Sequence, residues 1–115
     1  MITVGLSLTG RPCLVVGGGE VALRRITKLI DEEAQILVVS PAVLPDIETY
    51  HAQGQLQWIE GPYRSQYMVG QQFVIIATDN PIVNTQVMDD ATAVGAFINR
   101  ADVKDKSTWV FGSAT

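Results

Sequence analysis

The residues best suited to chemistry lie in a glycine-rich turn near the start of the chain. From Cys13 to Ala22 the sequence passes from an apolar run through three consecutive glycines into a helical pattern. Gly17, Gly19 and Ala22 match the G-x-G-x-x-G/A spacing: the first glycine turns the chain, the second lets the backbone approach a pyrophosphate, and the third small residue lets helix and strand pack closely. Free amides at the start of the helix then face an anion. The pattern predicts nucleotide binding; a tight packing turn without a ligand is the alternative.

A second part of the dinucleotide-binding pattern differs in this chain. An acidic residue at the end of the second strand usually binds the hydroxyl groups of the adenosine ribose. This sequence has Ser40 and Pro41 at that point. Ser40 can donate one hydrogen bond to a ribose, and no arginine or lysine follows to bind a 2′-phosphate. The sequence therefore favours NAD over NADP.

These residues need a frame of strands and helices that brings their loops together. Apolar runs typical of strands alternate with helical patterns along the chain. We expect strands over residues 13–16, 35–39, 56–60, 73–78 and 96–99, helices over 20–32, 44–53 and 81–95, a helical turn over 65–69, and an edge strand or arm over 2–8. The alternation predicts one α/β domain with a Rossmann-like, doubly wound parallel sheet and right-handed crossovers. The strand over 73–78 is the most apolar, and we expect it at the centre of the sheet.

Ligands of such sheets bind in the crevice at the carboxyl ends of the strands. The loops that meet there span residues 17–20, 40–42, 78–81 and 99–102. We therefore expect the functional site to be built from these four loops.

Composition and charge exclude several classes of protein. The chain has 115 residues, 47% of them hydrophobic, and a formal net charge of −4 without a basic cluster, so we expect a single domain and no nucleic-acid partner. No signal segment and no apolar run long enough for a membrane span is present, so we expect a cytoplasmic protein. Cys13 is the only cysteine, which rules out an internal disulfide and a thiolate zinc cluster, and we expect it to be buried in its strand. No metal site is predicted.

Four spaced motifs give the chain a specific resemblance. They are Gly17-Gly-Gly-Glu-Val-Ala-Leu-Arg-Arg25, Glu60-Gly-Pro-Tyr63, Ala77-Thr-Asp-Asn-Pro-Ile-Val-Asn84 and Asn99-Arg-Ala-Asp102. In this order they resemble the signatures of the siroheme synthase amino-terminal family, which comprises precorrin-2 dehydrogenases, some of which are also sirohydrochlorin ferrochelatases. The resemblance implies an NAD-dependent oxidoreductase of siroheme (porphyrin) biosynthesis that oxidises the tetrapyrrole precorrin-2 to sirohydrochlorin, with iron insertion as a second activity.

The resemblance, together with the loops named above, also suggests which residues form the site. The expected cofactor-binding residues are Gly17, Gly18, Gly19, Glu20, Val21, Ser40, Pro41, Ala77, Thr78, Asp79 and Asn84. The family's catalytic aspartate corresponds to Asp102, which would accept a proton as hydride leaves for nicotinamide or ligate iron during chelation. Simpler roles are helix capping for Asp79, a bond to backbone for Asn84 and solvated surface for Asp102.

The chain departs from the family pattern toward its carboxyl end. Arg100 stands where the family has a small aliphatic residue, and Lys104 and Gly112 replace prolines. We expect residues 1–102 to form the NAD-binding domain and residues 103–115 to be a tail that starts a truncated dimerisation segment, with part of the substrate site absent. The apolar stretch 109–111 would then lack cover, which predicts pairing with the sheet edge or self-association as a homodimer.

A function from a different class shares the glycine turn. A non-catalytic NAD(H)-binding sensor or regulatory module needs the cofactor site but does not need Asp102. A structural relic without a ligand would require the glycine turn to be closed or blocked. Replacement of Asp102 by asparagine separates the two functions: it should abolish any dehydrogenase activity, whereas a sensor would keep both its NAD binding and its control of a partner.

Overall fold

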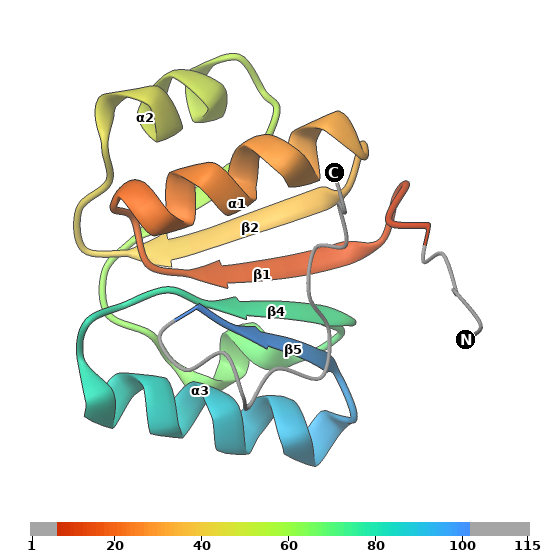
Figure 1. Ribbon diagram of the computed structural model, residues 1–115, viewed down its shortest axis with the longest axis vertical. Coiled ribbons are helices and arrows are strands. Elements are labelled where there is room, and N and C mark those ends of the chain that lie inside the picture. The colour runs from red at the N-terminus through yellow and green to blue at the C-terminus, as the bar shows by residue number, and fades with distance from the viewer. Residues whose placement is uncertain (1–6, 102–115) are drawn as a thin grey trace.

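The structure, a computed structural model, describes residues 7–101 of the chain. Strands and helices alternate in the predicted order (Figure 1). The elements are β1 (Pro12–Val16), α1 (Glu20–Asp31), β2 (Gln35–Ser40), α2 (Pro45–Ala52), β3 (Gln57–Glu60), the 3-10 helix η1 (Ser65–Met68), β4 (Phe73–Ile76), α3 (Pro81–Val94) and β5 (Phe97–Arg100). The expected bounds are confirmed to within a few residues. Asp102 and residues 103–115, with the expectations that rest on them, lie outside the described residues, as do residues 1–6.

The five strands form one parallel sheet in the order β3-β2-β1-β4-β5. Cys13 on β1 lies opposite Ile36 on β2 and Phe73 on β4. The middle position is therefore taken by β1, and the expectation that the strand over 73–78 is central was wrong. Because β1 and β4 are both buried and apolar, hydrophobicity does not show which of the two lies at the centre of the sheet. The crossover after β3 decides the order, because it returns the chain to the free side of β1.

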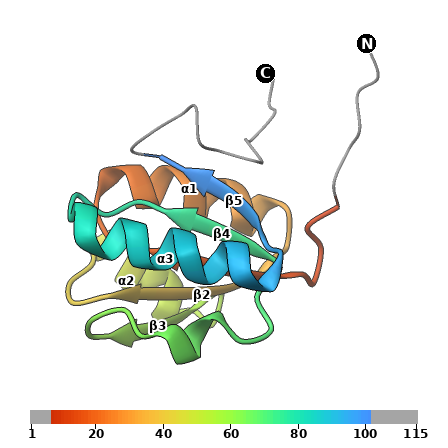
Figure 2. The ribbon, with the colours of Figure 1, turned by 90° about the horizontal axis from the view of Figure 1, so that it is seen from below.

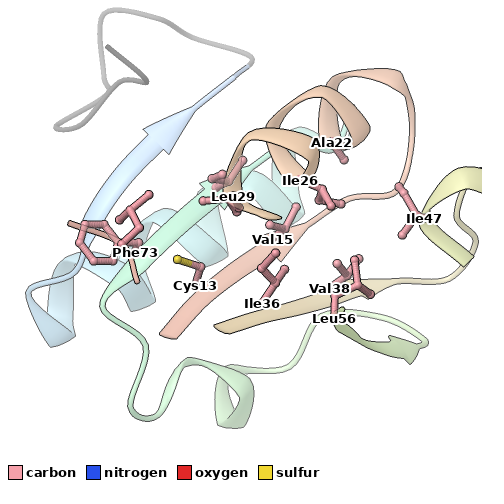
Figure 3. Packing of buried hydrophobic residues seen from close by; sticks show 12 residues of the cluster. Cys13, Val15, Ala22, Ile26, Leu29, Ile36, Val38, Ile47, Leu56 and Phe73 are labelled. Carbon is pink, nitrogen blue, oxygen red and sulfur yellow. The ribbon is translucent and has the colours of Figure 1, made fainter. Parts of the chain in front are cut away.

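Helices cover both faces of the sheet. Figure 1 shows α1 and α2 on one face and α3 on the other, and Figure 2 gives the view with α3 in front of the sheet. Because side chains alternate along a strand, Cys13 and Val15 point toward α1, whereas Leu14 and Val16 point toward α3. Ile26 and Leu29 of α1 pack onto the first of these faces with no exposed surface (Figure 3). Two apolar layers thus hold the strands whose ends form the site.

The helix that follows β4 begins and ends as its sequence predicts. The Oδ1 atom of Asn80 accepts hydrogen bonds from the backbone amides of Ile82 and Val83 at 3.0 and 3.2 Å, and Pro81 occupies the first turn. Gly95 ends α3 in the left-handed conformation, with φ of 73°. Val94, the last residue of α3, is 52% exposed. Among residues 7–101 no helix combines the length and apolar character that a membrane span requires.

Candidate functional site

A cleft of about 1060 Å³ lies at the carboxyl ends of β1, β2, β3 and β4. It is lined by the loops that follow these strands, by Ala101 after β5, by the start of α1 and by the first two turns of α3. Of the predicted cofactor-binding residues, all except Asn84 line it: Gly17, Gly18, Gly19, Glu20, Val21, Ser40, Pro41, Ala77, Thr78 and Asp79. The topology thus brings together residues from three separate loops at the predicted edge of the sheet.

The first two glycines of the turn are packed against the neighbouring loops. Gly17 has φ of 131°, and a Cβ atom there would lie 2.3 Å from the carbonyl oxygen of Ala77. A Cβ at Gly18 would lie 2.3 Å from the carbonyl oxygen of Ala42 and 2.9 Å from Oγ of Ser40. Only glycine allows such close approach. These two residues shape the turn, as the packing explanation of the glycines requires.

The third glycine is different, because it faces open space. Apart from its two chain neighbours, no heavy atom of residues 7–101 would lie within 4 Å of a Cβ at Gly19. Gly19 is also the N-cap of α1, and it has no side chain that could cap the first turn of that helix. The first amides of a helix carry partial positive charge and need acceptors. The start of α1 is therefore open toward an anion in the cleft, while Ala22 is fully buried behind it and lets the helix pack closely.

The loop after β2 is held by hydrogen bonds at Ser40. The carbonyl oxygen of Ser40 accepts bonds from Nε1 of Trp58 at 3.0 Å and from the amide of Gly61 at 3.2 Å. Its hydroxyl donates to the carbonyl oxygen of Ala42 at 2.6 Å. The donor that we expected to reach a ribose is therefore already in use, and Ser40 is only 7% exposed. Pro41, next to it, is exposed at the cleft.

Asn84, on α3, is hydrogen-bonded to the loop after β4 and does not line the cleft. The residue is 2% exposed, and its Nδ2 donates to the carbonyl oxygen of Thr78 at 2.9 Å. The Thr78 hydroxyl donates in turn to Oδ1 of Asn84. Asn84 thus has the simpler of its two expected roles, a hydrogen bond to the backbone. Asp79 lines the cleft and is exposed; the cap of α3 is its neighbour Asn80.

The charges at the cleft bear on which ligand it can take. Among the described residues that line it, the charged ones are Glu20 and Asp79, and none is lysine or arginine. The positive potential for a pyrophosphate therefore comes from the backbone amides at the start of α1. A ligand with a further phosphate away from α1 would meet no cation on this lining.

Part of the lining was missed by the sequence analysis. Pro62, Tyr63, Val83 and Gln86 line the cleft, and no role was assigned to them. Tyr63 ends the motif Glu60-Gly-Pro-Tyr63, and this motif was the one sequence signal that pointed to the loop after β3. Its hydroxyl donates to Oδ2 of Asp90 on α3 at 2.7 Å. Burial raises the pKa of Tyr63 above its ordinary value, and the hydrogen bond and negative charge of Asp90 raise it further.

Two other reactive residue types lie outside the cleft. His51 is exposed on α2, where its Nδ1 lies 3.3 Å from the carbonyl oxygen of Leu56. Cys13 is fully buried in β1, as expected, and burial raises its pKa from 9.0 to about 12. Such a thiol is a packing residue. Within residues 7–101, no three His, Cys, Asp or Glu side chains gather in a way that could hold a metal ion.

The fold and the cleft together define an α/β domain of the dinucleotide-binding class. A family model described as "Putative NAD(P)-binding" matches residues 4–113, and the chain belongs to this family. The resemblance to siroheme synthases is confirmed as well. Siroheme synthase 3 of Aeromonas hydrophila is 36% identical over 106 residues, and the siroheme synthase of Photorhabdus laumondii is 34% identical over 112 residues.

These matches cover most of this chain and a smaller part of the relatives. The two alignments span 92% and 97% of this chain but 23% and 24% of the siroheme synthases. Among solved structures, SirC, a precorrin-2 dehydrogenase, superposes with a TM-score of 0.80 at 36% identity, over 87% of this chain and 50% of SirC. D-lactate dehydrogenase from Escherichia coli, at 9% identity and a TM-score of 0.50, shares the fold alone, over 90% of this chain and 43% of its own.

Proposed function

We propose that the chain binds NAD in this cleft and forms the cofactor-binding domain of a precorrin-2 dehydrogenase. The observation that carries the proposal is the open start of α1. Gly19 lines the cleft and has no side chain to cap α1, and a Cβ there would meet no described atom beyond its chain neighbours within 4 Å. Gly17 and Gly18 shape the turn before it. The residues present therefore fit a dinucleotide. The likeness to siroheme synthases and to SirC supports the choice of substrate.

The charges at the cleft support NAD rather than NADP. A 2′-phosphate on the adenosine ribose needs an arginine or lysine beside the end of β2. Pro41 and Ala42 occupy that position, and the charged residues of the described lining are carboxylates. Placing two further negative charges there without a cation would weaken binding.

For the reaction, we assign separate tasks to the loops. NAD, when bound, supplies the hydride acceptor. The amides of α1 hold its pyrophosphate, and the Thr78–Asn84 pair keeps the loop after β4 in place. Oxidation of precorrin-2 removes a hydride and a proton. Asp102 comes directly after Ala101, which lines the cleft, and we assign the uptake of the proton to its carboxylate.

The experiment combines calorimetric titration with an anaerobic assay on the same sample. The chain is titrated with NAD, NADH and NADP, then mixed with precorrin-2 while NADH formation is followed by its absorbance. We expect NAD to bind more tightly than NADP, and any NADH formation seen with the wild type to be lost in Asp102→Asn. Binding without turnover would be consistent with a cofactor-binding domain that is not active by itself and with the sensor function. Absence of dinucleotide binding would contradict the proposal. Cytoplasmic location, self-association and iron insertion remain predictions for separate tests.

A further inference from the structure

One wall of the cleft is held by side chains that the proposed function does not use. Tyr63, in the loop after β3, lines the cleft together with Gln86 of α3. Asp90, one turn further along α3, accepts hydrogen bonds from the Tyr63 hydroxyl and from Oγ of Ser65, both at 2.7 Å. Nε2 of Gln86 donates to the same Ser65 Oγ at 3.4 Å. The loop is thereby tied to α3 by charge-assisted bonds at a carboxylate, which are stronger than bonds between neutral groups.

The position of this wall identifies the half of a dinucleotide that would lie against it. The pyrophosphate belongs at the start of α1, above β1. In this class of fold the adenosine ribose lies at the end of β2, and β3 is the neighbour of β2 on the side away from β4. The Tyr63 loop follows β3, and the amide of Gly61 in that loop is bonded to the carbonyl oxygen of Ser40 at the end of β2. Tyr63 is thus on the adenosine side of the cleft.

The chemistry of this wall suits a purine ring. Pro62, Tyr63 and Val83 present apolar surface, and the Tyr63 ring packs partly into the core under α3. Gln86 adds an amide group that can donate and accept hydrogen bonds at a base edge. Concave, mostly apolar surfaces with a few polar groups are typical of sites for small ligands and cofactors. None of these four side chains carries a charge, so a base that binds here does not bury a charged group.

We propose that Tyr63 forms the wall of an adenine subsite and that Asp90 is the positioning residue that holds it there. The inference rests on the proposed binding of NAD and adds the residues that select its adenine half. Asp90 does not line the cleft; it acts through the Tyr63 hydroxyl. Without Asp90 the Tyr63 hydroxyl loses this acceptor, the outer part of the ring is held less firmly, and the ligand must order it on binding. Ordering one such side chain weakens affinity by about 2- to 10-fold.

The test measures three ligands against a set of matched variants. Tyr63→Phe removes only the hydroxyl, and Asp90→Ala removes its acceptor. Asp90→Asn keeps an oxygen that can accept the bond and is the conservative rescue. Asp89→Ala removes the same charge from the neighbouring, exposed position on α3 and is the control. Calorimetry of the 115-residue chain gives Kd for NAD, ADP-ribose and nicotinamide mononucleotide.

We expect Tyr63→Phe and Asp90→Ala each to raise Kd for NAD and ADP-ribose by about 2- to 10-fold. The double variant should show no loss beyond that of Asp90→Ala, because Asp90→Ala already removes the bond that Tyr63→Phe breaks. Affinity for nicotinamide mononucleotide should not change, and Asp90→Asn and Asp89→Ala should resemble the wild type. A merely structural role of Asp90 would weaken all three ligands alike and would overturn the inference, as would unchanged affinity in both variants. A wild-type chain that binds no dinucleotide would overturn the proposed function itself.

Discussion

Replacement of Gly19 by alanine should separate cofactor binding from folding. Gly19 has φ of −93° and ψ of −159°, a conformation that alanine adopts. Beyond its chain neighbours, the added Cβ meets no atom of the described part of the chain within 4 Å. Alanine is a poorer N-cap than glycine, which lowers the free energy of unfolding by roughly 0.5–1 kcal/mol. Alanine also reduces the conformational entropy of the unfolded chain, which raises the free energy of unfolding by about 0.4–1 kcal/mol. The two effects offset each other. We expect the melting temperature to stay within about 4 °C of the wild type.

Binding should respond strongly to the same change. The methyl group would occupy the space in front of the first amides of α1, where the pyrophosphate must approach. Each hydrogen bond to a charged group contributes about 1.5–3 kcal/mol. Loss of two such bonds weakens binding by at least ~3 kcal/mol, which raises Kd for NAD more than about 100-fold.

Gly18→Ala is the matched control, one position earlier. Its Cβ would lie 2.3 Å from the carbonyl oxygen of Ala42 and 2.7 Å from Cγ1 of Val43, so the loop after β2 must move. Overpacking of this kind costs about 1–3 kcal/mol, and each kcal/mol lowers the melting temperature by about 4–8 °C. Calorimetric titration and thermal unfolding of both variants provide the measurements. Wild-type affinity in Gly19→Ala, or equal destabilisation of the two variants, would refute the reasoning.

Three further predictions concern the loops and the core. Ala42→Arg places a cation at the exposed end of β2 and should raise affinity for NADP relative to NAD by about tenfold or more, measured by titration with both. Asn84→Ala leaves the Thr78 carbonyl without its buried donor and should lower the free energy of unfolding by about 1–3 kcal/mol in urea, whereas the exposed Thr85→Ala should not. Burial raises the pKa of Cys13 from 9.0 to about 12, so between these values the thiol loses its proton only in the unfolded chain. The free energy of unfolding should therefore fall as the pH rises from 9 toward 12, and Cys13→Ala should remove that part of the pH dependence.

The frame of the site could be predicted from the sequence because its signals are local. Asn80 and Pro81 mark the start of α3 within two adjacent residues, and the glycine turn marks the junction of β1 and α1. The expectation that parallel strands present their loops at one edge then placed Gly17, Ser40 and Thr78 around one cleft. Each step needed only the pattern of a short segment and a general rule of topology.

The remaining details depend on contacts between distant segments. Tyr63 and Asp90 are 27 positions apart, and nothing in either segment predicts their hydrogen bond. The bond from Trp58 to the carbonyl oxygen of Ser40 spans 18 positions, and it decides how the loop after β2 is held. The direction of the Ser40 hydroxyl depends on the shape of that loop as well. Such contacts depend on how the whole domain packs, and the spacing of apolar residues along the sequence does not contain this information.

The contact between Gly17 and Ala77 also has a consequence for the order of folding. Gly17 lies directly against the backbone of Ala77, and the Ala77 amide is bonded to the carbonyl oxygen of Val16, so the glycine turn is bounded by a segment 60 residues later. A nascent chain that ends before β4 can form the first three strands but has only part of the cleft. Ligands stabilise only the states that bind them. NAD would therefore act late, favouring chains in which β4 has already paired with β1, and would not serve as a template for the first half of the sheet.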